Sequence, residues 1–203
     1  MPLTAQNRPV VLVVKDDEQV LDLLVDLLEP EGYKVFTAET GKRALELTKT
    51  LRVDLILCDV VMPEMNGLEL CHLLKSDSNT ASIPIMMVSA VRKEDAARLE
   101  GYSAGADDYV EIPFRNEEIL IKIARLVERH RADVALQKSE EEYRLLFKAN
   151  PCPMWLCDQQ TLQFLAVNDA AVQHYGYSRE EFLAMTAKEI LPEEDVALSL
   201  IHI

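Results

Sequence analysis

The sequence has little positive charge for its length. Its 203 residues include 21 Lys and Arg against 35 Asp and Glu, which gives a formal net charge of −14. A protein that binds nucleic acid through its own surface usually presents a basic face, so this composition argues against nucleic-acid binding by this chain. No apolar run approaches the roughly 18–20 residues that span a bilayer. The N-terminus has no apolar segment ahead of a signal-peptide cleavage site. These absences predict a cytoplasmic protein that contacts neither nucleic acid nor membrane.

Paired cysteines and repeats are also missing. The four cysteines (Cys58, Cys71, Cys152 and Cys157) form no CxxC pair, which favours free, mostly buried thiols over a disulfide framework or a zinc site. No internal repeat or low-complexity tract is present. With 49% hydrophobic and 28% charged residues, the chain can bury a core without disulfides, in one large domain or two small ones.

The first half alternates between strand-like and helix-like segments. Strands are expected at residues 10–14, 34–38, 55–59, 83–90 and 105–111. Helices are expected at residues 20–28, 41–50, 68–75 and 94–104, with a further helix beginning near 116. Strands that alternate with helices of about ten residues predict βαβ units with right-handed crossovers. The fold class is therefore α/β, with a doubly wound parallel sheet of five strands.

Acidic and hydroxyl residues follow the predicted strands. Lys15, Asp16 and Asp17 come after the first strand, Asp59 ends the third, and Ser89 lies at the end of the fourth. Parallel strands end at one edge of the sheet, where α/β proteins bind ligands. Carboxylates gathered there raise one another's pKa unless a cation such as Mg²⁺ neutralises them. Such a carboxylate can attack a phosphoryl group and form an aspartyl phosphate. In the alternative interpretation, Asp16 and Asp17 only cap the first helix.

These residues carry a family resemblance over residues 9–125. The motifs are Val11 to Val14 followed by acidic residues, Asp59 with Met62-Pro63 and Gly67, Val88-Ser89-Ala90, and Gly105 to Tyr109 leading to Pro113-Phe114. Together they make this half resemble the receiver domain of a two-component response regulator, a flavodoxin-like fold.

The resemblance implies roles for the acidic residues. It implies that Asp59 accepts a phosphoryl group from a histidine kinase or a phosphotransfer protein. It also implies a Mg²⁺ ion held by Asp16, Asp59 and the main-chain carbonyl of Val61, with Asp17 as a further candidate ligand.

The resemblance also identifies switch residues. Ser89 matches the switch hydroxyl and Tyr109 the switch aromatic, while Pro113 matches a proline that usually follows a cis peptide bond.

Two positions depart from the family. Lys15 stands where the family has an acidic residue, and Ile112 stands where it has a lysine. Two unit charges about 4 Å apart interact by roughly 4 kcal/mol at an effective dielectric constant of 20, so a Lys15–Asp59 ion pair could compete with Mg²⁺ and with phosphorylation. In the alternative, Lys15 points to solvent and its amine substitutes for the missing lysine.

Residues 116–148 contain neither Pro nor Gly and predict a long helix. A weak heptad pattern runs through Leu120, Val127 and Val134, and through Ile123, His130 and Gln137. The pattern favours a coiled coil with a second copy over a single solvated linker helix. His130 is expected to lie in solvent or on the seam.

The last part of the chain predicts a hairpin with strands at 154–158 and 162–168, followed by short helices. Ser178 and Glu181 form a capping box. Motifs within residues 140–196 resemble the N-terminal part of a PAS domain: Tyr143 to Phe147, Ala149-Asn150-Pro151, Val167 to Ala171, Tyr175 to Phe182, and Ile190 to Asp195. The later PAS strands are not in the sequence, so we expect a piece of a longer protein or completion by partner chains. The PAS ligand is unknown.

Together these features predict a two-component signalling protein with a receiver at 9–125, a helical linker at 126–139 and the N-terminal part of a PAS domain at 140–203. The chain is predicted not to be an enzyme, and any output activity lies outside it. The alternatives are an N-terminal fragment of a hybrid histidine kinase, and a pseudo-receiver scaffold in which Lys15 and Ile112 impair phosphorylation.

Overall fold

The computed structural model describes residues 8–89 and 103–190. The chain divides into two compact units, Met1–Val134 and Ala135–Ile203. Most of the helix predicted at 94–104 lies outside the described residues. Within the described parts, no helix is both long enough and apolar enough to cross a membrane.

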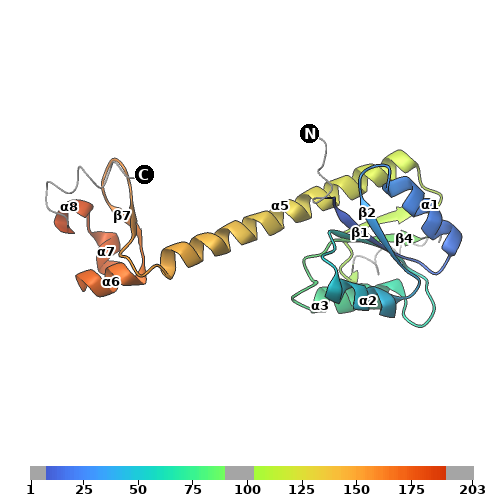
Figure 1. Ribbon diagram of the computed structural model, residues 1–203, viewed down its shortest axis with the longest axis horizontal. Helices are drawn as coiled ribbons and strands as arrows, with labels where there is room; N and C mark the ends of the chain where they lie inside the picture. The colour runs from blue at the N-terminus through green and yellow to red at the C-terminus, as the bar shows by residue number, and fades with distance from the viewer. Residues whose placement is uncertain (1–7, 90–102, 191–203) are drawn as a thin grey trace. The chain divides into compact units, whose positions relative to one another are not determined.

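The first unit contains a parallel sheet with the strand order β2-β1-β3-β4-β5 (Figure 1). The strands are β1 (Val10–Val14), β2 (Lys34–Ala38), β3 (Leu55–Asp59), β4 (Ile85–Ser89) and β5 (Asp108–Glu111). This confirms the predicted doubly wound sheet, and its order places the crossover reversal between β1 and β3. Strand β4 begins later than predicted, at Ile85, because Pro84 has no N–H to donate to a neighbouring strand.

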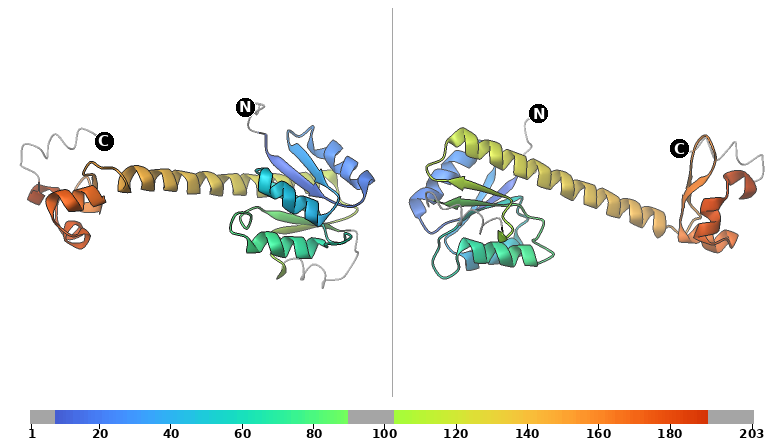
Figure 2. Two further views of the ribbon diagram at one scale, coloured as in Figure 1. Left: turned by 60° about the horizontal axis from the view of Figure 1, so that its bottom comes forward. Right: turned by 180° about the vertical axis from the view of Figure 1, so that it is seen from behind.

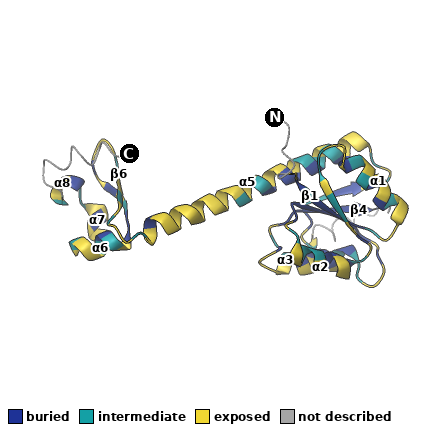
Figure 3. Cartoon of the chain, in the orientation of Figure 1, coloured by how far each residue is buried: buried dark blue, intermediate teal, exposed yellow. Residues whose placement is uncertain are grey.

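Helices cover both faces of this sheet (Figures 1 and 2). The bounds are α1 (Glu18–Leu28), α2 (Gly41–Thr50), α3 (Gly67–Ser76) and α5 (Asn116–Lys148). Strand residues alternate between the two sides. Val11 and Val13 pack in the cluster that contains residues of α1 and α5, whereas Leu12 and Val14 pack in the cluster that contains residues of α2 and α3. Burial on both faces explains why the strands read as continuous apolar runs (Figure 3).

Capping residues position the loops at the C-terminal edge of the sheet. The Asp17 carboxylate accepts hydrogen bonds from the backbone N–H groups of Gln19 (3.0 Å) and Val20 (3.3 Å), at the start of α1. Asn66 and Glu69 form a capping box at the start of α3. Asp17 therefore has the capping role that the alternative interpretation gave to Asp16 and Asp17 together, whereas Asp16 is not the cap of α1.

Helix α5 is continuous over 33 residues. Within the first unit, Ile119, Ile123, Leu126 and Val127 pack against the sheet. His130 is only 9% exposed, so the expectation that it lies in solvent or on a coiled-coil seam was wrong. Ile123, which lies seven residues before His130 in the same predicted heptad pattern, is likewise buried in the receiver core.

The second unit is built around a two-stranded antiparallel sheet, β6 (Trp155–Cys157) and β7 (Phe164–Val167). Helices α6 (Asp169–Tyr175), α7 (Arg179–Ala184) and α8 (Ala187–Ile190) follow. Phe164 and Phe182 are fully buried and meet edge to face, with ring centroids 5.4 Å apart. The predicted capping box of Ser178 and Glu181 is present at α7. The hairpin and short helices agree with a partial PAS module.

Candidate phosphoryl-acceptor site

Asp59 occupies the C-terminal end of β3 and is 7% exposed. One carboxylate oxygen, Oδ2, accepts a hydrogen bond from the ammonium group of Lys15. The other, Oδ1, accepts one from the backbone N–H of Val61 at 3.2 Å. Both oxygens of a nearly buried carboxylate are therefore held by donors, one of which carries a full positive charge.

Lys15 reaches this carboxylate from the end of β1, the strand next to β3. Its backbone N–H donates to the carbonyl of Ala38 at 3.0 Å, which extends the pairing of β1 with β2 by one residue. Its side chain is 13% exposed, and its Nζ lies 3.7 Å from Oδ1 of Asp16. Of the two positions expected for this amine, the structure has the one against Asp59.

The surroundings of Lys15 keep its amine protonated. Burial by itself lowers the pKa of this lysine. The hydrogen bond to Asp59 and the charges of Asp59, Asp16 and Asp17 outweigh burial, so the pKa is raised above the ordinary value. The site therefore contains a permanent internal cation at neutral pH.

Ser89 lies beside Asp59. Strand register pairs Asp59 with Val88, so the next residue, Ser89, follows directly on the adjacent strand, and it is 1% exposed. Tyr109 lies one strand further, on β5, and is buried in the cluster that faces α2 and α3.

Ile112 adds no charge to this edge. Its N–H donates to the carbonyl of Ser89 at 2.8 Å, and its side chain packs against the cluster on the α1 and α5 side. The peptide bond between Ile112 and Pro113 is cis, as the resemblance implied.

Only some of the predicted divalent-ion ligands lie together at the Asp59 site. Asp16 and Asp59 both lie near the Lys15 ammonium, whereas Asp17 is engaged as the cap of α1. Val61 is 64% exposed and contacts Asp59 through its N–H. Among the described residues, no group of three or more His, Cys, Asp or Glu side chains is arranged to hold a metal ion. As arranged, the residues fit an ammonium group rather than a divalent cation, and the Mg²⁺ site stays a prediction.

The tight packing of Gly67 below Asp59 is a feature that the sequence did not reveal. A Cβ atom on this glycine would lie 2.0 Å from the carbonyl oxygen of Asp59 and 2.9 Å from its carbonyl carbon. The start of α3 can therefore approach the end of β3 only because residue 67 has no side chain.

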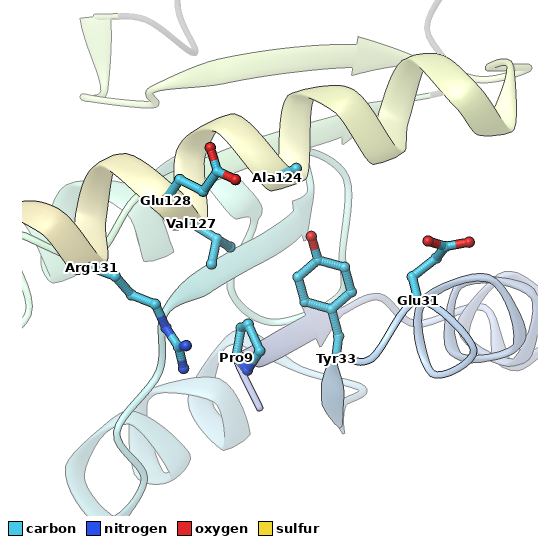
Figure 4. Close-up of a pocket in the computed structure, with 7 residues that line it drawn as sticks. All are labelled: Pro9, Glu31, Tyr33, Ala124, Val127, Glu128 and Arg131. Atoms are coloured by element: carbon cyan, nitrogen blue, oxygen red, sulfur yellow. The ribbon is translucent and has the colours of Figure 1, made fainter. Parts of the chain in front are cut away.

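A second polar cluster, not predicted from sequence, lies at the opposite edge of the sheet. Asp54 precedes β3 and accepts hydrogen bonds from the N–H of Val10 (2.7 Å) and from Nε and Nη2 of Arg131 (2.9 and 3.1 Å). Arg131 also lines a cavity of about 220 Å³ between α5 and the starts of β1 and β2. Figure 4 shows the lining residues Pro9, Glu31, Tyr33, Ala124, Val127, Glu128 and Arg131. No local pattern signals this contact, because Asp54 and Arg131 are 77 residues apart.

Comparison with known proteins agrees with this fold. A family model of the response regulator receiver domain matches residues 11–124, and a PAS-domain model matches residues 141–199. The chain belongs to the response regulator receiver family and carries a PAS domain after the receiver.

Its relatives include regulators and a kinase. The chain is 37% identical over 136 residues to the uncharacterized transcriptional regulatory protein YrkP of Bacillus subtilis, covering 67% of this chain and 56% of the relative. It is 32% identical over 212 residues to a "probable transcriptional regulatory protein" of Picosynechococcus, covering 84% and 83%. It is 34% identical over 126 residues to histidine kinase P4 of Formosa agariphila, covering 62% of this chain and 9% of the kinase. The chain thus spans little more than half of YrkP.

Solved structures match the first unit. CheY4 of Vibrio cholerae aligns with a TM-score of 0.56 at 30% identity, covering 59% of this chain and 99% of CheY4. The receiver of a signal transduction histidine kinase from Syntrophus aciditrophicus aligns with a TM-score of 0.56 at 28% identity, covering 59% and 90%.

Proposed function

We propose that this chain is a two-component signalling protein whose receiver accepts a phosphoryl group on Asp59 from a histidine kinase or a phosphotransfer protein. The observation that carries this proposal is the nearly buried Asp59 carboxylate at the C-terminal end of β3, held by an ammonium group and a backbone N–H. Membership of the receiver family, with relatives described as regulators and as a histidine kinase, supports it.

The residues around Asp59 have complementary tasks in this proposal. The Val61 N–H holds one carboxylate oxygen, which fixes the direction in which the other can attack phosphorus. The Lys15 ammonium contributes positive charge where the oxygens of an incoming phosphoryl group carry negative charge. Ser89 and Tyr109 follow on β4 and β5, and we assign them the switch roles that respond to the new charge.

The proposed signal leaves the receiver through α5. We propose the receiver at residues 9–125, a helical linker at 126–139 and the PAS part at 140–203, acting as a homodimer through the linker helix and the PAS module. Exposed residues of α5 that follow one another at alternating spacings of four and three residues support the dimer. We call them the 132–146 stripe: Ala132, Leu136, Ser139, Tyr143 and Leu146.

The test is to incubate the full chain with phosphoramidate and Mg²⁺ and to follow intact mass. One added phosphoryl group, found on Asp59 after fragmentation and absent in Asp59→Asn, is the expected result. Wild-type protein that stays unlabelled, or an Asp59→Asn variant that is labelled equally, contradicts the proposal.

A second candidate is a pseudo-receiver that serves as a dimerisation scaffold. The Lys15–Asp59 ion pair favours it, because an ion-paired carboxylate must release its partner or share it before it can react. Absence of labelling from a folded, dimeric protein would support this candidate.

The match to the Formosa histidine kinase supports a third candidate, the N-terminal fragment of a hybrid kinase. A kinase core encoded beyond residue 203 in the source gene would identify it.

A further inference from the structure

We propose that Lys15 is the resident cation of the Asp59 site, and that Asp59 accepts a phosphoryl group without a divalent metal ion. This inference rests on the proposed function, because it concerns the same transfer to Asp59. It assigns to Lys15 the charge neutralisation that a divalent ion would otherwise supply.

The position of the ammonium group is the first support. It contacts Oδ2 of Asp59 and lies 3.7 Å from Oδ1 of Asp16, so it is shared by two carboxylates from two adjacent strand ends. A divalent ion that used both carboxylates would compete for the same oxygen atoms.

The charge count is the second support. The α1 backbone N–H groups bind the Asp17 carboxylate, which leaves Asp16 and Asp59 to share the cation. Two carboxylates and one ammonium carry a net charge of −1. A hard divalent ion binds most tightly to sites with several anionic oxygen ligands, and here one position next to Asp16 is cationic instead.

Three other lysines in the described parts pair with carboxylates other than Asp59. Lys42 pairs with Glu64 at 3.0 Å, Lys75 with Asp107 at 2.8 Å and Lys122 with Asp108 at 2.6 Å. Ile112, on the loop after β5, packs among apolar side chains. Lys15 is thus the cation that the described structure places against Asp59.

The reaction balances without any co-reactant. With phosphoramidate as donor, a carboxylate oxygen of Asp59 forms a bond to phosphorus while the P–N bond breaks, and the nitrogen leaves as ammonia with the three protons that it carried in the zwitterion. The acyl phosphate keeps two negative charges, and the Lys15 ammonium, already protonated, moves from the carboxylate oxygen to a phosphoryl oxygen.

The experiment compares phosphoramidate labelling of the full chain in EDTA and in Mg²⁺, by intact mass. The variants are Lys15→Arg, which keeps the charge, Lys15→Met, which removes it at similar length, and Lys15→Asp, which adds a carboxylate. Circular dichroism melting confirms that each variant is folded, and Mg²⁺-dependent shifts of the melting temperature report metal binding independently of labelling.

The expected result is that the wild type is labelled to the same extent in EDTA and in Mg²⁺, and that Lys15→Arg, which keeps the positive charge, is also labelled without a metal ion. Lys15→Met should lose labelling in EDTA. Lys15→Asp should be labelled only with Mg²⁺ and should bind Mg²⁺ at least about tenfold more tightly than wild type, because ligand charge sets affinity.

Labelling of the wild type only in Mg²⁺ overturns this inference and leaves the proposed function standing, as does full labelling of Lys15→Met in EDTA. Failure of the wild type to be labelled in either condition overturns both.

Discussion

Gly67 sets the distance between α3 and the end of β3. We predict that Gly67→Ala lowers the free energy of unfolding by about 3 kcal/mol, because the new Cβ would lie 2.0 Å from the Asp59 carbonyl oxygen and neither backbone can move freely. Urea unfolding measures the change.

Gly41→Ala is the matched control. Its Cβ would meet Sδ and Cγ of Met65 at 2.8 and 2.9 Å, and these atoms move when the flexible side chain rotates; the remaining contact, 3.1 Å to Cβ of Met65, needs a shift of only a few tenths of an ångström. We expect the free energy of unfolding to fall by no more than about 1 kcal/mol, because the better helix propensity of alanine partly offsets the cost of the contact. An equal loss in both variants would contradict the explanation.

The carboxylates of the site can be located from the sequence, but their contacts cannot. Asp16, Asp59 and Ser89 could be assigned to one edge because each follows a strand of a parallel sheet. The direction of the Lys15 side chain could not be predicted, because its flexible chain can reach either solvent or Asp59. Gly67 was recognised as part of a motif, yet its contact with the Asp59 carbonyl depends on the packing of α3 and is invisible in one dimension.

Helix α5 is fixed to the far edge of the sheet by Arg131. We predict that Asp54→Ala lowers the free energy of unfolding of the receiver by about 2–3 kcal/mol, because it leaves the Val10 N–H and the guanidinium of Arg131 without this acceptor. Chemical denaturation followed by circular dichroism measures it.

The control for this pair is Glu46→Ala, whose partner Arg43 lies on the exposed face of α2. Removal of an exposed i,i+3 pair should cost no more than about 0.5 kcal/mol. A similar cost at both positions would show that the Asp54 contact is no stronger than a surface ion pair.

His130 gives the same helix a pH dependence. Burial lowers the pKa of this histidine below its ordinary value, and the positive charge of Arg52 lowers it further. The negative charges of Asp54 and Asp133 and a hydrogen bond to the backbone of Ser82 act in the opposite direction but do not outweigh burial. The unfolded chain therefore binds the proton more readily than the folded receiver.

We predict that stability is full above pH 6.5, the ordinary histidine value, and falls as the pH drops below it. His130→Gln should flatten this slope between about pH 7 and 5, whereas substitution of the exposed His72 by Gln should keep it. Unfolding curves at several pH values test this. A wild-type slope retained in His130→Gln would refute the assignment.

The long helix was predictable, but its buried face was misassigned. The absence of Pro and Gly from 116 to 148 correctly indicated a helix. The heptad through Ile123 and His130 suggested a seam because a repeat of 3.5 residues and one of 3.6 residues differ little over two or three turns. In the structure these residues face the sheet. Whether this face of the helix packs against the sheet or against a second helix depends on contacts with residues far away in the sequence, and these cannot be read from the helix sequence alone.

The exposed 132–146 stripe predicts that two copies of the chain associate through α5. We expect the full chain to form dimers, and Leu136→Lys with Leu146→Lys to weaken the dimer by at least about tenfold per substitution, because each removes a buried leucine from the interface. Sedimentation velocity over a concentration series measures the dissociation constant.

Leu145→Lys is the control, since Leu145 is 60% exposed and lies on the opposite side of the helix from the stripe. Its dimer should be as strong as that of the wild type. A monomeric wild type, or equal weakening by Leu145→Lys, would contradict a coiled-coil seam at this stripe.

The two-part organisation could be predicted because each part has several local motifs, whereas the residues that connect the parts have few. The receiver motifs, from the acidic residues after β1 to Pro113-Phe114, agreed with the family match at 11–124, and the PAS motifs agreed with the match at 141–199. The domain boundaries within α5 stay predictions, because the helix passes through them without a break.

The Lys15 ammonium, rather than a divalent ion, is proposed to neutralise Asp59, and a crystal structure of the full chain grown in excess Mg²⁺ tests this. We expect the Lys15 ammonium on the Asp59 carboxylate, with no metal ion shared by Asp16 and Asp59. An octahedral ion bound by Asp16, Asp59 and the Val61 carbonyl, with Lys15 turned into solvent, would contradict it.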